Sequence, residues 1–362
     1  MGRSIGRPGV DRHRGESQAG AVRGGGGSGP TAAVDGAQAG ASRRHAGGRP
    51  RAIVLGDLVL DIVLTPSRPL RSGTDVVGRV VFRQGGSAAT TARVLAGEGV
   101  ASALVTAAGE DGAGPALAAY LREQGVEVHA VPVRSPHSGR LGVLIEPSSE
   151  RTFVADRGAI LRLRPHHLRA AWFHDADLLH LPAYSLLGER LTATAERAAT
   201  LARARGARVS VDLASAGFLE DFGAEAVLAT VRRIRPDVLL ANELERRTVL
   251  AGRKGVGVDA LLDLAPIVVL KQGREGALLV ATGLGREIVA AARPASVADS
   301  TGAGDAFDAG FLAAWLRSGA PQAGPRARSA LERALRAGHR AARREVLGRR
   351  MEFSLADLRP AR

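Results

Sequence analysis

The residues best suited to chemistry lie in one short stretch, Asp299 to Phe307, which reads D-S-T-G-A-G-D-A-F. Gly302 and Gly304 keep side chains away from the backbone, so an anionic group can approach the amides of Gly302, Ala303 and Gly304. These amides precede a predicted helix and therefore lie at the positive end of its dipole. Asp305 falls in the first helical turn, where its carboxylate would repel phosphate unless it had a proton to accept. The stretch predicts phosphoryl transfer to a hydroxyl group, with Asp305 as the catalytic base.

The helix that must hold this stretch is indicated by its aromatic residues. Phe307, Phe311 and Trp315 recur every fourth residue, which predicts one buried helical face. A glycine-rich helix start also occurs as a purely structural feature, so this motif alone leaves the assignment open. The surrounding strands and helices are therefore needed to decide whether this helix start is functional or structural.

Strands and helices alternate along the second half of the chain. This alternation predicts a three-layer α/β/α fold with a mostly parallel central sheet. The predicted strands are 178–181, 208–213, 238–240, 267–270, 277–280 and 287–290, and the predicted helices lie near 186–205, 219–233, 243–251 and 258–264.

The first half of the chain predicts further strands with two acidic residues among them. The apolar run 52–55 ends at Gly56-Asp57, and a second run, 58–64, contains Asp61. Carboxylates at the carboxyl ends of such strands lie where open α/β sheets bind ligands. Asp61 stands between Leu60 and Ile62, so it either faces a polar pocket or is an unpaired buried charge, and we expect it to bind a ligand. Asp57 is expected to be an ordinary turn carboxylate.

The strands predicted within about 57–83 and 126–156 form a small β-sheet apart from the main body. Residues 1–50 are rich in Gly, Ala, Ser and Arg and show no periodicity, so we expect a disordered tail ahead of a kinase domain at 51–362.

Composition limits the classes of protein that the chain can belong to. Its 362 residues include no cysteine, which excludes disulfides and Cys-ligated metal sites, and no apolar run is long enough to span a bilayer. Without a secretory signal, we expect a cytoplasmic protein. The net charge of +14 is spread along the chain and aromatic residues make up only 3%, which disfavours a nucleic-acid partner.

Two motifs resemble signatures of the ribokinase/PfkB family of sugar kinases. Residues 299–305 match the form D-T-x-G-A-G-D, with Ser300 in place of the usual Thr, and residues 85–92 match G-G-x-x-x-N-x-A, with Thr90 in place of Asn. The resemblance implies that the small sheet is a lid over a sugar. The sugar-binding residues that it implies are Asp61, Gly85, Gly86 and Thr90, together with Glu150, for which a solvated turn residue is the favoured reading.

Further turns match the family in the same order along the chain. Asn242 and Glu245 match N-x-x-E, which implies an indirect role for Glu245 in holding Mg²⁺ beside the phosphates, although the pair also reads as a capping box. The turn that begins at Lys271 and Gly273 implies, with Asn242, contacts to the nucleotide. Asp299 and Thr301 match positions that bind a monovalent cation, such as K⁺, in family members.

The expected function is therefore that of an ATP-dependent sugar kinase, which transfers the γ-phosphoryl group to a primary hydroxyl with Mg²⁺ present. The alternatives are a nucleoside kinase of the adenosine type, a sugar-phosphate kinase, and a non-catalytic regulator that binds sugar or nucleotide. The regulator is suggested by Thr90 and by Ile160, which replaces an Asn of the family. A homodimer formed through the lid is allowed by the resemblance.

Overall fold

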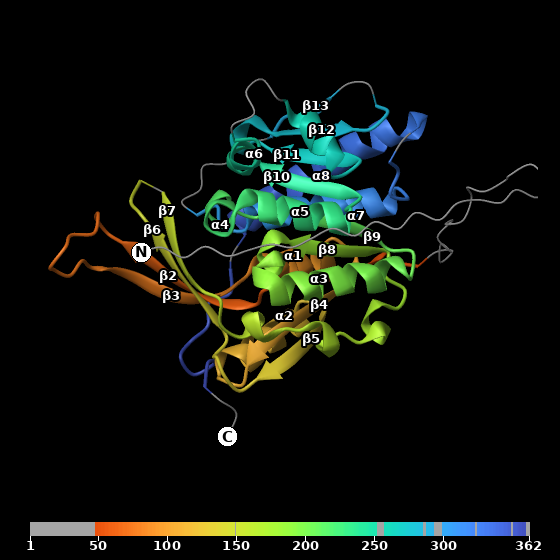
Figure 1. Cartoon of the computed structure of the whole chain (residues 1–362). Coiled ribbons are helices and arrows are strands. Elements are labelled where there is room, and N and C mark those ends of the chain that lie inside the picture. Colours follow the sequence, from red (N-terminus) through yellow and green to blue (C-terminus); the bar gives the residue numbers. More distant parts are fainter. Residues whose placement is uncertain are drawn as a thin grey trace, which may run out of the picture. The chain divides into compact units, whose positions relative to one another are not determined.

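The computed structural model describes residues 48–148, 150–251, 257–284, 287–292, 299–322, 324–348 and 350–359 (Figure 1). All of them fall in the unit Ser42–Arg362, one of two into which the chain divides. The tail predicted over residues 1–50 lies, apart from 48–50, outside the described residues. 

The regular elements occur in the following chain order. They are β1 (Arg51–Leu55), β2 (Val59–Pro66), β3 (Gly78–Gly85), α1 (Ser87–Gly97), β4 (Ala101–Gly109), α2 (Ala113–Glu123), β5 (Val126–Val133), β6 (Gly139–Ile145), β7 (Arg151–Asp156), β8 (Leu178–Pro182), α3 (Gly188–Arg203), β9 (Arg208–Asp212), α4 (Ala216–Phe222), α5 (Ala224–Ile234), β10 (Val238–Asn242), α6 (Glu243–Val249), β11 (Ile267–Lys271), β12 (Ala277–Ala281), β13 (Ile288–Ala290), α7 (Ala303–Arg317) and α8 (Pro325–Leu347).

Within the described residues, nine strands form the central sheet, in the order β13-β12-β11-β10-β9-β8-β1-β4-β5. Neighbouring strands from β11 to β5 run parallel, whereas β12 runs antiparallel to both β11 and β13. The connections explain this arrangement. A parallel pair needs a crossover connection, which the helices provide, whereas a short turn, such as that between β11 and β12, gives an antiparallel pair.

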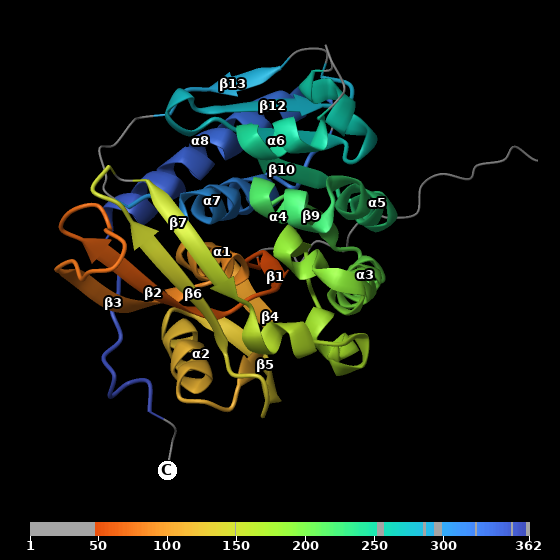
Figure 2. The same ribbon diagram turned by 60° about the vertical axis from the view of Figure 1, so that its left-hand side comes forward.

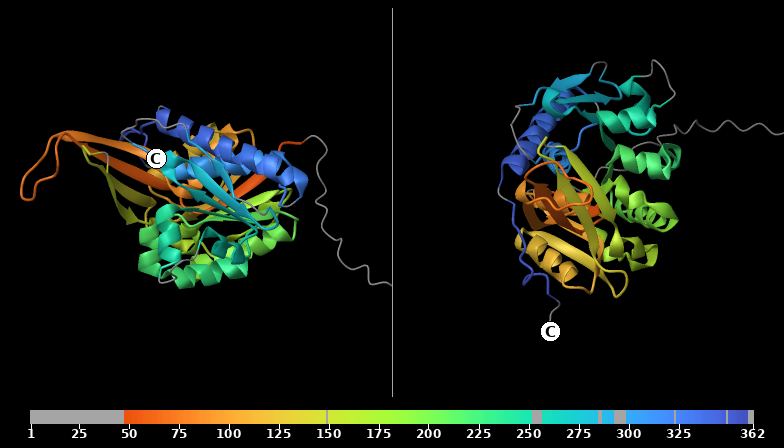
Figure 3. Two further views of the ribbon diagram at one scale, coloured as in Figure 1. Left: turned by 90° about the horizontal axis from the view of Figure 1, so that it is seen from above. Right: turned by 90° about the vertical axis from the view of Figure 1, so that its left-hand side faces the viewer.

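Helices cover both faces of the central sheet (Figure 3). Successive strand residues point to opposite faces: Ile53 and Leu55 of β1 pack in the core beneath α3 and α5, whereas Ala52 and Val54 pack in the core beneath α1, α7 and α8. Strands that are buried on both faces are apolar throughout, and this explains the uninterrupted apolar runs in the sequence. The predicted three-layer α/β/α fold is thus confirmed.

A smaller sheet consists of strands β3-β2-β6-β7 in that order (Figure 2). Strand β2 pairs antiparallel with β3 and parallel with β6, and this register sets Asp61 between Arg83 and Leu141. Its core is a cluster of three buried residues, Val63, Val143 and Ile145. This small core means that the sheet depends on the main body for much of its stability.

Three sequence-based expectations about elements differ from the structure. Strand β5, expected in the small sheet, is the edge strand of the central sheet, because β4, α2 and β5 close a parallel strand–helix–strand unit. The predicted helix 219–233 is two helices, α4 and α5, separated by Gly223 with a φ of 82°. The predicted helix near 258–264 is a 3₁₀ helix over Val258–Asp263.

In the part of the chain that the structure describes, no helix has both the length and the apolar character needed to cross a bilayer.

Candidate active site

A cavity of about 1230 Å³ opens at the carboxyl ends of the parallel strands, between the central and the small sheet. This is the edge at which α/β sheets bind ligands. Most of the site residues predicted from the sequence line it, and they come from elements far apart in the chain. They are Asp61, Gly85, Gly86, Thr90, Asn242, Glu245, Lys271, Gly273, Thr301, Gly302, Ala303, Gly304 and Asp305.

The N-terminus of α7 borders this cavity with unused amide groups. Gly302 precedes the helix with a φ of 72°, a conformation that favours glycine, and no side chain caps the helix. The Ala303 amide donates to the Ser300 carbonyl at 3.2 Å. The amides of Gly304 and Asp305 have no acceptor among the described residues, as expected for a helix start that receives an anion.

Asp305 lies in the first turn of α7, partly buried at the cavity. Burial, followed by the nearby carboxylate of Asp212, raises the pKa of Asp305 to about 7, while the Ser87 hydroxyl and the Lys271 ammonium act in the opposite direction. A carboxyl group with a pKa near neutrality is well matched to accept a proton from a hydroxyl and to release it again.

Lys271 occupies the centre of a buried charge cluster beside Asp305. Its Nζ donates to Asp212 Oδ1 at 2.7 Å and to Asp308 Oδ2 at 3.0 Å. Burial alone would lower the pKa of Lys271, but the carboxylates of Asp212, Asp308 and Glu245 outweigh it and raise this pKa. The ammonium is therefore charged, and it lies 3.7 Å from the position that a Cβ on Gly304 would take. The positive charge of Lys271 thus lies close to the start of α7.

Asn242 and Glu245 form the predicted capping box at the start of α6. Glu245 N donates to Asn242 Oδ1 at 2.9 Å, and Asn242 N donates to Glu245 Oε2 at 2.7 Å. Glu245 is only 1% exposed, and burial together with Asp212 raises its pKa to about 7. Both residues also line the cavity, so the cap does not remove them from the site.

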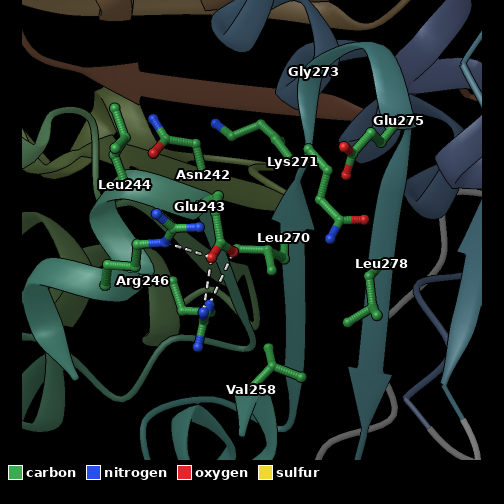
Figure 4. Close-up of a pocket in the computed structure, with 12 residues that line it drawn as sticks. Asn242, Glu243, Leu244, Arg246, Val258, Leu270, Lys271, Gly273, Glu275 and Leu278 are labelled. Carbon is green, nitrogen blue, oxygen red and sulfur yellow. Dashed lines mark hydrogen bonds and ion pairs between the residues drawn. The ribbon is translucent and has the colours of Figure 1, made fainter.

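A second cavity of about 660 Å³ adjoins the first on the side of α6, β11 and β12 (Figure 4). Four residues line both cavities: Asn242, Leu244, Lys271 and Gly273. The wall of the second cavity is partly apolar, through Val258, Leu270 and Leu278, and Glu243 on the same side is paired with Arg246 at 2.8 Å. A ligand that is flat and apolar at one end and anionic at the other would extend from this cavity toward α7.

Asp61 and the paired glycines lie on the opposite side of the main cavity. Burial and the charge of Asp57 raise the pKa of Asp61 to about 7, and its Oδ1 is buried with no hydrogen-bond partner among the described residues. A Cβ on Gly85 would lie 1.8 Å from this Oδ1, and Gly86 has a φ of 98°. The glycines therefore admit both the Asp61 carboxylate and the turn that leads into α1.

Thr90 lies on α1, and its short side chain has an amide beside it. Gln84 Nε2 donates to Thr90 Oγ1 at 3.4 Å and to the Gly85 carbonyl at 3.0 Å, while Gln84 Oε1 accepts from Arg93 Nε at 3.1 Å. Gln84 also lines the cavity. An amide is therefore present in this region, supplied by β3 instead of by position 90.

Two predicted residues, Glu150 and Asp299, do not line the cavity. Glu150 is exposed in the turn between β6 and β7, where its carbonyl accepts from the Glu146 amide at 2.9 Å, in agreement with the turn-residue reading. Asp299 is partly buried, and its Oδ1 accepts from the Thr301 amide at 2.9 Å. Asp57, expected to be an ordinary turn carboxylate, does line the cavity, and its Oδ1 accepts from the Ala88 amide at 3.2 Å, at the start of α1.

Sequence reasoning missed three charged residues of this region: Asp212, Asp308 and Arg350. Asp212 ends β9, so the same rule that singled out Asp61 would have found it. Asp308 follows Asp305 by three residues and lies one helical turn along. For Arg350, which contacts Asp299, no sequence signal existed, because its position depends on the path of the chain after α8.

The carboxylates at the cavity suit a hydrated magnesium ion better than a metal held by protein ligands alone. Among the described residues, no three His, Asp or Glu side chains come together as a metal site. Asp212 and Glu245 nevertheless line the cavity beside the helix start, and Mg²⁺ usually keeps several waters and uses few protein carboxylates. These residues therefore fit such an ion.

Comparisons with known proteins give the family to which the chain is similar. A model of the family described as pfkB family carbohydrate kinase matches residues 49–350. An ATP-dependent ribose-1-phosphate kinase from Halopiger xanaduensis is 32% identical over 239 residues, which cover 65% of this chain and 74% of that protein.

Solved structures of similar fold include a probable sugar kinase from Rhizobium etli and an adenosine kinase from Sinorhizobium meliloti. Each has a TM-score of 0.71, at 22% and 21% identity respectively. The first match covers 83% of this chain and 94% of the solved one, and the second covers 85% and 98%. These likenesses extend over almost the whole of each relative, and the chain, as its two signatures predicted, belongs to the pfkB family of carbohydrate kinases and has a ribokinase-like fold.

Proposed function

We propose that the chain is an ATP-dependent sugar kinase that transfers the γ-phosphoryl group to a primary hydroxyl, with Asp305 as the catalytic base. The observation that carries the proposal is the position of Asp305. Its carboxyl group, with a pKa near 7, lies at the cavity in the first turn of α7, directly beside amides that have no acceptor. A proton acceptor and an anion-binding helix start are thus combined in one turn.

The chemical step follows from this combination. Asp305 takes the proton of the acceptor hydroxyl while the hydroxyl oxygen forms a bond to the γ-phosphorus. The bond between that phosphorus and the β,γ-bridging oxygen breaks, and ADP is released. The amides of Gly302 and Gly304 stabilise the charge on the transferring group, together with the amide of Ala303, which in this structure donates to the Ser300 carbonyl. Lys271, held beneath them by Asp212 and Asp308, adds fixed positive charge. Mg²⁺, when bound, neutralises charge on the phosphate oxygens.

The two cavities support opposite approaches of the two substrates. The smaller cavity accepts the nucleotide, with Asn242, Lys271 and Gly273 at its junction with the larger one. The sugar lies on the side of Asp61, Gly85, Gly86 and Thr90, where the unpaired Asp61 Oδ1 accepts from a sugar hydroxyl. The small sheet acts as the lid on this side.

A phosphorylated sugar is a second candidate for the acceptor. Four arginines of the small sheet and its exit line the cavity, namely Arg83, Arg140, Arg151 and Arg157. Among the described residues, the side chain of Arg151 has no hydrogen-bond or ion-pair partner, whereas Arg83 is paired with Asp299 and Glu352. A relative that is named a ribose-1-phosphate kinase agrees with this candidate. Arg157 is less available, because it pairs with Asp57 at 3.5 Å and lies over the ring of Tyr184.

A substrate panel tests the proposed function. The purified protein is incubated with ATP, Mg²⁺ and ribose, fructose, 2-keto-3-deoxygluconate, ribose 1-phosphate or adenosine, and both ADP and the phosphorylated product are quantified. We expect equal amounts of the two products with at least one acceptor. If sugars or ATP bind but no phosphorylated product forms with any acceptor, the chain is a non-catalytic binding protein and the proposal fails.

A further inference from the structure

Arg350 reaches back to the stretch that precedes α7, from a segment that follows α8. Its Nη1 donates to Asp299 Oδ2 at 3.2 Å, and its Nη2 donates to the carbonyl oxygen of Thr301. The side chain is only 22% exposed. A third contact, from Nε to Glu345 Oε1 at 3.7 Å, fixes the guanidinium from the side of α8.

A second guanidinium approaches the same carboxylate from the small sheet. Arg83 Nη1 donates to Asp299 Oδ2 at 3.2 Å, and Arg83 Nη2 donates to Glu352 Oε1 at 3.1 Å. The other oxygen of Asp299 accepts from the Thr301 amide. Both oxygens of this carboxylate therefore already have donors from the chain itself.

A monovalent cation, which the family resemblance implied at Asp299 and Thr301, does not fit these contacts. The ion would need the Asp299 carboxylate and the Thr301 carbonyl as ligands, and both face the Arg350 guanidinium. It would also lie next to two positive side chains, which repel it in a site that is only partly exposed to water. The expected cation is thus at odds with the residues present.

We propose that the guanidinium of Arg350 takes the place of the monovalent cation, so that the reaction of this chain needs no K⁺. The inference rests on the proposed phosphoryl transfer. The Thr301 carbonyl and the Gly302 amide belong to one planar peptide group and point in opposite directions. By holding this carbonyl, Arg350 fixes the orientation of the peptide group that carries the Gly302 amide, and it keeps a positive charge beside the anion-binding turn. Arg350 also lines the main cavity, but its guanidinium is engaged by Asp299 and by the Thr301 carbonyl, so we assign it as a positioning residue that acts through this turn.

Arg350 is better suited to this role than Arg83. Only Arg350 contacts the Thr301 carbonyl as well as Asp299, whereas the second contact of Arg83 is to Glu352, away from the turn. Arg350 contacts both the turn before α7, at the Thr301 carbonyl, and the end of α8, at Glu345. It therefore links this turn to α8.

The test compares turnover in K⁺ with turnover in a buffer whose only monovalent cation is tetramethylammonium. We expect wild-type kcat to differ by less than twofold between the two. For Arg350→Ala we expect kcat to fall about 10- to 100-fold, the size typical of residues that orient a site from behind. In this variant, millimolar guanidinium, or K⁺, should restore part of the lost rate, while equal urea should not.

Two further variants at position 350 and one control variant separate the effect of charge from an effect on folding. Arg350→Lys keeps the positive charge and should retain more activity than Arg350→Gln, which keeps a donor but no charge. Arg336→Ala, on the exposed side of α8, should behave as wild type. Thermal melts add a readout besides turnover: guanidinium should raise the melting temperature of Arg350→Ala relative to that of wild type.

The outcomes distinguish this inference from the proposed function. Wild-type turnover that requires K⁺ overturns the inference and leaves the sugar kinase intact, as does an Arg350→Ala variant with wild-type kcat or one that neither guanidinium nor K⁺ restores. An absence of wild-type turnover with every acceptor in both buffers instead overturns the proposed function.

Discussion

At the scale of single residues, the site is dominated by carboxyl groups whose burial makes ionisation costly. Asp61, Glu245 and Asp305 each have a pKa raised to about 7, with burial as the largest cause in all three. Such groups are expected where a protein sacrifices stability for chemistry, because substrate and ions that bind later supply the missing partners. The mostly buried ammonium of Lys271 lies beside these groups and donates to the carboxylates of Asp212 and Asp308.

The raised pKa of Asp61 predicts a pH-dependent cost to stability. Its unfolded pKa is near 4, so the folded protein holds a proton on Asp61 between about pH 4 and 7 that the unfolded chain has lost. The contribution of Asp61 to stability therefore falls as the pH rises through this window. We expect Asp61→Asn to melt at a higher temperature than wild type at pH 8, with a gain that disappears below pH 4.

Thermal melts of both proteins between about pH 3 and 8 check this prediction. The difference between the two curves isolates Asp61, because buried His180, whose pKa is lowered to about 4, changes stability in the opposite sense in both proteins. Asp75→Asn, in the exposed loop between β2 and β3, serves as the control. A gain that grows toward low pH would contradict the assignment.

At the scale of elements, turns fixed by glycine decide where the site residues meet. The G-G turn before α1 could be predicted from sequence because its pattern is local, and so could the helix start at Gly302. The break between α4 and α5 could not, because Gly223 lies within a continuous apolar pattern that reads as one helix. The strand-end rule points to Asp212, but its contact with Lys271 and Asp308 could not be predicted, since that contact depends on β9, β11 and α7 lying side by side.

The G-G turn carries a prediction of its own. Gly85→Ala would place a Cβ 1.8 Å from Asp61 Oδ1, so that β3 or the carboxylate must move. We expect a loss of about 1–3 kcal/mol in the free energy of unfolding, as for other overpacked sites, together with weaker binding of the sugar.

Gly97→Ala provides the matched control for this substitution. Gly97 ends α1 and has no atoms within 4 Å of the added Cβ, so the change should stabilise the helix by up to about 1 kcal/mol. Denaturant unfolding of both variants gives the comparison. Equal stabilities for the two would show that the contact with Asp61 does not constrain Gly85.

At the scale of the whole molecule, each of the two sheets positions a different group of site residues. The central sheet and its helices bring Asp212, Asn242, Lys271 and Asp305 to one edge, and the small sheet adds Asp61 and the arginines on the opposite side of the cavity. The fold class followed from the alternation of strands and helices. The position of β5 did not, because its apolar pattern is the same in either sheet and only its pairing with β4 distinguishes them.

The tail predicted from composition should be dispensable for folding and turnover. Among the described residues, the first contacts with the fold involve Arg49, whose Nε donates to the Gly99 carbonyl at 3.0 Å, and Pro50, whose carbonyl accepts from the Ala101 amide at 2.8 Å. Deleting residues 2–48 keeps both. We expect an unchanged melting temperature and unchanged kcat; a clear loss of either would show that the tail contributes to the kinase.

The most direct test of the central claim is single-turnover phosphoryl transfer by Asp305→Asn. The substitution keeps the size of the side chain but removes the proton acceptor and a buried negative charge. We predict that the rate falls by about 10²–10⁴ while ATP still binds, as measured by calorimetry, and that the thermal melt shows an intact fold. A variant that transfers the phosphoryl group within a few-fold of the wild-type rate would contradict the role of Asp305 as the base.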